Sequence, residues 1–100
     1  MSKPLCYLPE AAGDVGEAYV YYEERVTGLG DEFLEQLRIR TTAIRENPEM
    51  YGVLRDNVRA APLRRFPYVI YYRSDPSETV ILAVLHGRRN PKIWGSRARQ

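Results

Sequence analysis

The chain has 100 residues, of which 44% are hydrophobic and 28% are charged, a composition typical of one globular domain spanning residues 1–100 and not of a disordered protein. Its single cysteine, Cys6, excludes an internal disulfide, and its place in an apolar run predicts a buried thiol. No apolar stretch approaches the ~20 residues of a membrane span, and no apolar signal segment opens the sequence. We therefore expect a cytoplasmic protein without a membrane partner.

The charge is divided unevenly along the chain. Residues 1–57 hold 6 Lys and Arg against 11 Asp and Glu, a net charge of −5, whereas residues 58–100 hold 9 against 2, a net charge of +7. Arginine outnumbers lysine 13 to 2. Because the planar guanidinium binds carboxylate and phosphate groups in a bidentate manner, the asymmetry indicates an anionic partner, either nucleic acid or an acidic protein. The alternative is a basic surface that is merely solvated.

The first part of the chain predicts a short strand and then a helix. Residues 5–8 form an apolar run between two prolines, which fits a brief strand, and Pro9 suits the first turn of a helix. Apolar residues then recur every three or four positions up to Val26, which is the spacing of one helix face. Gly13 and Gly16 each cost this helix roughly 1 kcal/mol relative to alanine. We therefore expect packing to compensate, or a neighbouring element to approach closely there.

A second helix is predicted from Asp31 to Asn47. Residues 27–30 end the first helix, since their glycines adopt the left-handed conformation of a helix cap without strain. Asp31 is a suitable N-cap or first-turn acid for the next helix. Asn47 ends it because the residue before a proline avoids helical angles. Two helices joined by so short a turn form an antiparallel hairpin.

The second half of the chain predicts three strands, after a loop over residues 48–56. The predicted strands are residues 58–65, 68–73 and 79–85. Pro62 restricts the first to an edge or a bulge, whereas the other two are apolar on both faces, as in strands covered on both sides. Residues 86–100 are basic and lack periodicity. The predicted fold is α+β: a short N-terminal strand, an antiparallel helix hairpin, a three-stranded antiparallel β-meander with the helices on one face, and a basic C-terminal tail.

This order of elements, together with several local strings, resembles the RelE/ParE superfamily of toxins, and its ParE branch more closely. The matching strings run from about residue 7 to residue 97 and cover nearly the whole chain. They are Tyr21-Tyr22-Glu23, Gly28-Leu29-Gly30 with Phe33, the Asn47-Pro48 helix stop, Val58-Arg59, Leu63 to Arg73, and Ile81 to Pro91 followed by Trp94.

The resemblance implies the toxin of a bacterial type II toxin–antitoxin system, neutralised by an acidic, partly disordered antitoxin that folds onto it in a hetero-oligomer. ParE-type members poison DNA gyrase with no known catalytic chemistry of their own. RelE-type members are ribosome-dependent ribonucleases that cut mRNA, using positive charges to stabilise the pentavalent phosphate and a histidine, carboxylate or tyrosine to transfer protons. A third hypothesis is a toxin-fold protein that has lost toxicity and only binds an antitoxin or an operator.

Four arginines of the predicted meander are candidate site residues: Arg59, Arg64, Arg65 and Arg73. Together they would form an anion-binding sheet face for antitoxin carboxylates or target phosphates. Because alternate residues of a strand point to opposite faces, Arg59 shares a face with Arg64 only if the chain bulges near Pro62. The alternative is a set of solvated charges that discourage pairing at a sheet edge.

The predicted tail carries the remaining candidates. Arg88 and Arg89 directly follow the last buried strand, where RelE-type enzymes place a catalytic cation, although ParE-type sequences carry arginine there as well. His86 either acts as a general base near neutral pH or closes the strand as a hydrogen-bonded structural residue. Trp94 and Arg97 are candidate partner contacts, since tryptophan and arginine dominate interface hot spots. Trp94 equally suits an anchor that holds the tail on the core.

Tyr68 favours gyrase inhibition over RNA cleavage. In RelE the corresponding strand begins Gly-Tyr-Arg and that arginine is catalytic, whereas Phe66-Pro67-Tyr68 places tyrosine at this position. The terminal tyrosine of RelE also lacks a clear match, since the nearest aromatic residue is Trp94. Loss of a cation and a hydroxyl removes roughly a few kcal/mol of transition-state stabilisation. The residues left for ribonuclease chemistry are Arg59, Arg64, Arg73, His86 and Arg89.

The sequence predicts no cofactor and no metal. One cysteine and one histidine lie far apart and do not make a zinc site. The chain also has no glycine-rich phosphate loop and no nucleophile motif.

Replacement of Arg88 and Arg89 by glutamate should either weaken antitoxin binding by about tenfold or more, or abolish toxicity. The reason is that it reverses the charge directly after the last strand. The domain should stay folded. Antitoxin co-purification, growth arrest on induction and thermal unfolding measure the three properties. If binding and toxicity both survive, the tail is not the working surface.

Overall fold

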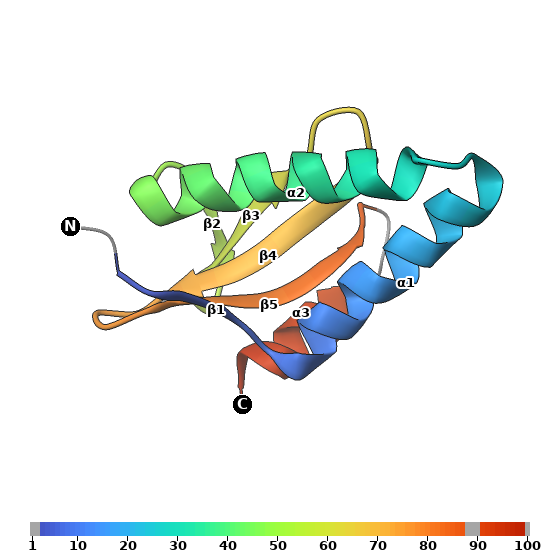
Figure 1. Cartoon of the computed structure of the whole chain (residues 1–100). Coiled ribbons are helices and arrows are strands. Elements are labelled where there is room, and N and C mark those ends of the chain that lie inside the picture. Colours follow the sequence, from blue (N-terminus) through green and yellow to red (C-terminus); the bar gives the residue numbers. More distant parts are fainter. Residues whose placement is uncertain (1–2, 88–90, 100) are drawn as a thin grey trace.

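A five-stranded sheet lies between two long helices and a short third helix in the computed structural model, which describes residues 3–87 and 91–99 (Figure 1). The helices are α1 (Pro9–Arg25), α2 (Leu29–Glu46) and α3 (Pro91–Ala98). The strands are β1 (Leu5–Tyr7), β2 (Val53–Arg55), β3 (Val58–Pro62), β4 (Tyr68–Ser74) and β5 (Thr79–His86). The predicted α+β class, with its helix hairpin and antiparallel meander, is confirmed.

The strand order is β1-β5-β4-β3-β2, in which β1 runs parallel to β5 and the other pairs are antiparallel. The prediction of a loop over residues 48–56 is wrong at its C-terminal end, where β2 pairs with β3. Asp56 and Asn57 connect these strands with φ angles of 53° and 62°. Two successive positive φ angles make a turn whose twist matches that of the flanking strands.

One carboxylate holds the turn between α1 and α2. Gly28 adopts the left-handed conformation, with φ of 90°, and α2 begins at the next residue, so Asp31 is a first-turn acid and not the N-cap. No side chain caps α2 from its N-cap position. Instead, Glu23 of α1 accepts hydrogen bonds from the amides of Gly28 (2.9 Å) and Gly30 (3.0 Å). These are amides that the start of a helix leaves without an intrahelical partner.

The larger core lies between the sheet and the two long helices. Its largest fully buried side chains are Phe33, Ile44, Ile70, Tyr72 and Ile81. Each such side chain contributes roughly 1.5–3 kcal/mol relative to an exposed one. The Tyr72 hydroxyl donates to the Pro48 carbonyl at 2.6 Å, which ties the end of α2 to β4, and burial raises the pKa of Tyr72 to about 12.

The opposite face of the sheet is covered by α3, so the prediction of an aperiodic C-terminal tail is wrong. Trp94 of this helix is 4% exposed and stacks on Tyr71 of β4, with 5.3 Å between the ring centroids and 15° between the planes. Apart from Ile93 and Trp94, α3 has no large apolar residue. A helix of eight residues is not stable alone. Its formation therefore depends on packing against the sheet, which periodicity in the sequence does not reveal.

An ion pair closes the edge of β5 beyond the end of β1. The last β1 partner on this edge is Ile81. Beyond it, Asp14 of α1 accepts a hydrogen bond from the Val84 amide (3.0 Å), and Arg97 of α3 donates to the Leu82 carbonyl (3.1 Å). The two side chains pair at 2.6 Å and are 11% and 16% exposed. They therefore join α1, β5 and α3 at one point.

The expectation of a buried Cys6 thiol is wrong, and of the two explanations for Gly13 and Gly16 the close approach of a neighbour does not apply. Cys6 is exposed, because β1 is an edge strand that turns only one of its faces towards the long helices. Desolvation is the main cause that raises the pKa of this thiol, and the hydrogen bond that the thiol donates to Glu78 (3.4 Å) raises it further. No neighbour approaches Gly13 or Gly16, since a Cβ atom at either position would meet nothing within 4 Å among the described residues.

Substitution of glycine by alanine should change the free energy of unfolding in opposite directions in α1 and α2. A Cβ at Gly30 would lie 2.8 Å from the Tyr19 ring and 2.9 Å from Glu23 Oε1, so Gly30→Ala should lower the free energy of unfolding by about 1–3 kcal/mol. Gly13→Ala should raise it by up to about 1 kcal/mol, because the site is open and helical. Urea unfolding measures both changes. Changes of the same sign in the two variants would contradict this account of the helix hairpin.

Removal of either partner of the Asp14–Arg97 pair should destabilise the fold by about 3 kcal/mol, because it leaves a largely buried charge and a strand-edge group without their partner. In a double-mutant cycle, the doubly substituted chain should lose clearly less than the sum of Asp14→Ala and Arg97→Ala. Glu35→Ala removes an exposed ion pair with Arg38 and serves as the matched control, with little expected change. Additive effects of the two substitutions would exclude a coupled pair.

Candidate functional site

Arg59 lies on the helix side of the sheet and binds backbone. It pairs in register with Tyr72, whose side chain belongs to the helix-side core. Its Nη1 donates to the carbonyl of Tyr51 at 2.6 Å and to that of Glu49 at 3.3 Å. Arg40 of α2 also reaches this segment through a hydrogen bond to the Tyr51 hydroxyl. The Arg59 guanidinium therefore fixes the connection between α2 and β2.

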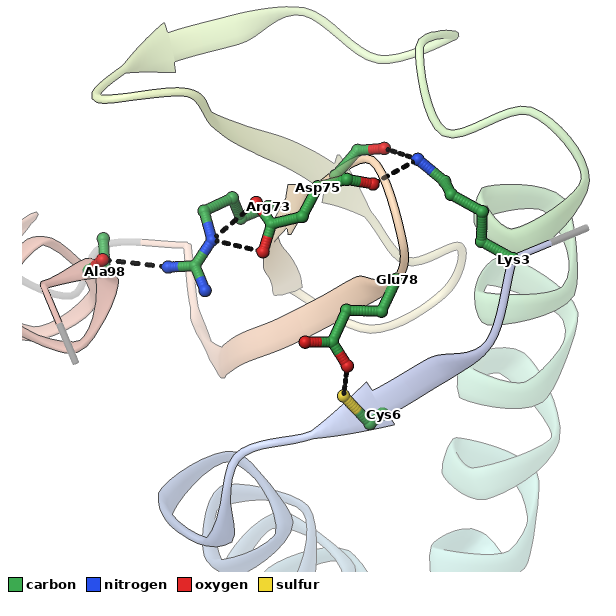
Figure 2. Close-up of polar contacts among 7 residues, drawn as sticks. Lys3, Cys6, Arg73, Asp75, Glu78 and Ala98 are labelled. Carbon is green, nitrogen blue, oxygen red and sulfur yellow. Dashed lines mark hydrogen bonds and ion pairs between the residues drawn. The ribbon is translucent and has the colours of Figure 1, made fainter.

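Arg73 lies on the α3 side of the sheet, as Figure 2 shows. Its Nε donates to both carboxylate oxygens of Asp75, at 3.0 and 3.1 Å, and its Nη1 donates to the carbonyl of Ala98 at 2.9 Å. Lys3 supports the same corner, because its Nζ donates to Ser74 Oγ and to the Asp75 carbonyl, each at 2.7 Å (Figure 2). Arg73 thus places a positive charge at the C-terminal end of α3, where the helix dipole favours it.

The expectation that the meander arginines share one anion-binding face is wrong. Arg59 and Arg73 occupy adjacent strands but point to opposite faces of the sheet. The strand that was predicted to carry Arg64 and Arg65 ends at Pro62, so these two residues lie in the turn before β4. The physical reason is the pleat, which turns successive side chains to opposite faces.

Arg64 and Arg65 remain on the surface of that turn. Arg64 is exposed. Arg65 has a φ angle of 70° and pairs with Glu32 of α2 at 2.6 Å, with side-chain exposures of 57% and 49%. An ion pair this exposed contributes little to stability. Both cations are therefore available to a partner.

Two of the candidates in the C-terminal segment hold α3 on the sheet. Trp94 stacks between Tyr71 and the guanidinium of Arg55, whose central carbon lies 5.2 Å from the Trp94 ring. The sequence left Trp94 open between partner contact and anchor, and its burial supports the anchor. Arg97 is occupied by the pair with Asp14 described above. The positions of Arg88 and Arg89 lie outside the described residues.

Tyr68 and His86 face each other at the end of the sheet. Their rings meet edge to face, with 5.8 Å between centroids, and Tyr68 also contacts Tyr22 (6.0 Å) and Phe33 (5.3 Å). Tyr68 is therefore a member of an aromatic cluster. His86 is half-buried at the last position of β5. Arg59 and Arg73 lie further along the sheet. Arg73 pairs in register with Val80, and Arg59 pairs with Tyr72, the partner of Ile81, whereas His86 pairs with Tyr68.

A groove along α1 lies beside these residues. It consists of two clefts of about 320 and 420 Å³ that share Tyr21, Tyr68 and His86. The first lies between α1, β5 and α3, and the second extends past the C-terminal end of α1. We name this feature the α1 groove. It is defined by Ala18, Tyr21, Arg25, Tyr68, Leu85 and His86.

Arg25 and Tyr21 form a stacked pair in the α1 groove that sequence reasoning missed. The central guanidinium carbon lies 3.5 Å from the centroid of the Tyr21 ring, and Nη1 donates to the Tyr21 carbonyl at 3.3 Å. Their spacing of four residues on a predicted helix is the one available signal, since such residues are neighbours on the helix surface. The stack holds the planar cation in place and leaves its edge available for hydrogen bonding.

In residues 3–87 and 91–99, no group of three His, Cys, Asp or Glu side chains is arranged to hold a metal ion. In the same part of the chain, no helix has the length and apolar character needed to cross a membrane.

Comparison with known proteins gives the chain its family. Residues 5–91 match the model of the family described as the ParE toxin of the type II toxin–antitoxin system, parDE. No curated protein matches. A chain of the chromosomal ParDE TA system from P. aeruginosa superimposes with a TM-score of 0.74 over 85% of this chain and 96% of that one, at 19% sequence identity. At that identity the structural similarity supports the fold alone, whereas the family match spans most of the sequence: the chain belongs to the ParE toxin family.

Proposed function

We propose that this ParE-family toxin inhibits DNA gyrase by binding it, without chemistry of its own, and that a ParD-like antitoxin neutralises it in the cytoplasm. Family membership supports the role of toxin in a toxin–antitoxin pair. The choice of gyrase over the ribosome rests on the separation of the described arginines.

The positions of Arg59 and Arg73 are the main argument against the ribonuclease alternative. RNA cleavage needs several cations directed at one phosphate. Arg59 donates to backbone carbonyls on one face of the sheet, and Arg73 donates to Asp75 and to the end of α3 on the other. Neither side chain can reach His86 while it keeps these partners. The catalytic set inferred from the sequence is therefore not assembled within the described residues.

The surface that contacts gyrase is proposed to include the exposed cations of the turn before β4. Arg64 and Arg65 project from the turn before β4. Arg88 and Arg89 are added on the sequence argument alone. Arg59, Arg73, Arg97 and Trp94 are excluded from this surface, since each has an internal structural contact.

Purified toxin at stoichiometric excess should inhibit DNA supercoiling by gyrase and increase the amount of cleaved DNA, because a bound protein that stalls the enzyme stabilises its cleaved complex. Supercoiling and cleavage assays on plasmid DNA measure both effects. Relaxation of the same plasmid by a type I topoisomerase is the control and should be unchanged. Antitoxin added in equimolar amount should restore supercoiling.

Mapping of mRNA ends after toxin induction separates the two activities. Under the gyrase proposal, no codon-linked cuts appear while DNA damage accumulates. Codon-linked cuts together with normal supercoiling would instead establish the ribonuclease alternative. A chain that arrests neither growth nor gyrase yet binds antitoxin would establish the third hypothesis, loss of toxicity.

A further inference from the structure

We propose that the α1 groove is the docking site for the toxin-binding segment of the antitoxin, and that Arg25 binds a carboxylate of that segment. This inference rests on the proposed toxin–antitoxin function. It adds the place where the antitoxin segment docks and the position of a carboxylate within that segment. The groove, the stacked cation and the charge distribution along α1 each support the proposal.

The Arg25 guanidinium is oriented but has no acidic partner within residues 3–87 and 91–99. Its plane is stacked on the Tyr21 ring, and its Nη1 donates a long hydrogen bond to the Tyr21 carbonyl. Among the described residues, the ion pairs are formed by other arginines, namely Arg38, Arg65, Arg73 and Arg97. A guanidinium whose orientation is already fixed loses less entropy on binding, and its free edge fits a carboxylate in a bidentate manner. Arg25 is therefore suited to bind an acidic side chain from a partner.

The middle of the groove is apolar and aromatic. Tyr21 is 46% exposed, and Ala18, Leu85 and Ile93 line the wall beside it. Tyr68 and His86 connect the two clefts. Rings that present both an apolar surface and a polar end are typical of interface anchors. From residue 14 to residue 25, α1 covers roughly 16 Å, which is the length of three turns of a docked helix or of about five extended residues.

The charges along the groove give the docked segment a direction. Asp14 is neutralised by Arg97, so Glu17 determines the sign of the potential at that end. Arg25 determines it at the other end. A complementary segment therefore carries its carboxylate at the Arg25 end, apolar side chains over Tyr21, and a basic or neutral residue near Glu17.

A peptide fits this groove better than nucleic acid does. Glu17 and Glu24 flank the exposed side of α1 next to Tyr21. Two carboxylates beside the groove repel a phosphate backbone, which needs a row of cations. Two adjacent exposed cations, Arg64 and Arg65, lie instead in the turn before β4. The antitoxin and the target are thus assigned to different parts of the surface.

Binding of the purified protein encoded beside the toxin gene, measured by calorimetry, tests the assignment. Arg25→Glu should weaken this binding by about tenfold or more, and Tyr21→Ala by a similar factor, because each removes an anchor of the segment. Arg45→Glu makes the same charge change at an exposed position of α2 away from the groove, and should change affinity by less than about twofold. Urea unfolding of each variant confirms that it is folded.

Charge reversal in the partner provides a second measurement. Glutamate and aspartate residues of the antitoxin's toxin-binding segment are replaced one at a time by arginine, and one of these variants should restore binding to the Arg25→Glu toxin. Gyrase inhibition by the Arg25→Glu toxin without antitoxin should equal that of the unmodified chain. Unchanged antitoxin affinity in both groove variants overturns the proposal. Normal antitoxin affinity with lost gyrase inhibition also overturns it and assigns the groove to the target.

These outcomes are separable from failure of the proposed function. If the unmodified toxin leaves gyrase untouched while the groove variants lose antitoxin affinity, the target is wrong and the docking site stands. If the unmodified toxin does not bind the protein encoded beside it, both the partner and the docking site are wrong.

Discussion

The Asp14–Arg97 ion pair determines how the C-terminal part of this molecule is arranged. Strand β1 covers only the first part of the β5 edge, and an uncovered strand edge is a site for unwanted pairing. Asp14 and Arg97 close that edge with one acceptor and one donor, as a neighbouring strand would. Because the two residues belong to α1 and α3, the same contact fixes α3 against the sheet. The placement of α3 therefore depends in part on a carboxylate far away in sequence.

This arrangement changes the meaning of the charge asymmetry. The net charge of +7 over residues 58–100 suggests one broad cationic surface. In the fold, Arg59, Arg73 and Arg97 point towards carbonyls and carboxylates of other segments. Arg59 and Arg97 contact the acidic half of the chain, at the Tyr51 carbonyl and at Asp14, whereas Arg73 contacts Asp75 and the Ala98 carbonyl within the basic half. Net charge along a sequence thus overstates the cationic surface when guanidinium groups form the contacts between elements.

The elements that the sequence predicts are those whose pattern is set by burial of a long face. Helices α1 and α2 and strands β4 and β5 follow from periodicity, and β5 is buried at nearly every position. Strand β2 is three exposed residues, and α3 has two large apolar side chains, so both depend on tertiary contacts. The same limit applies to the site. Which face Arg59 or Arg73 occupies depends on register, and the partners of both come from distant segments.

The α1 groove connects this architecture to neutralisation. Ile93 and Arg97 of α3 form part of its wall, together with Ala18 and Tyr21 of α1. A segment bound there touches both helices, so it adds to the contacts that already hold α3 on the sheet. A ligand that binds only one arrangement of a protein stabilises that arrangement by mass action. Under the proposed assignment, the bound antitoxin therefore stabilises the toxin fold with α3 in its docked position.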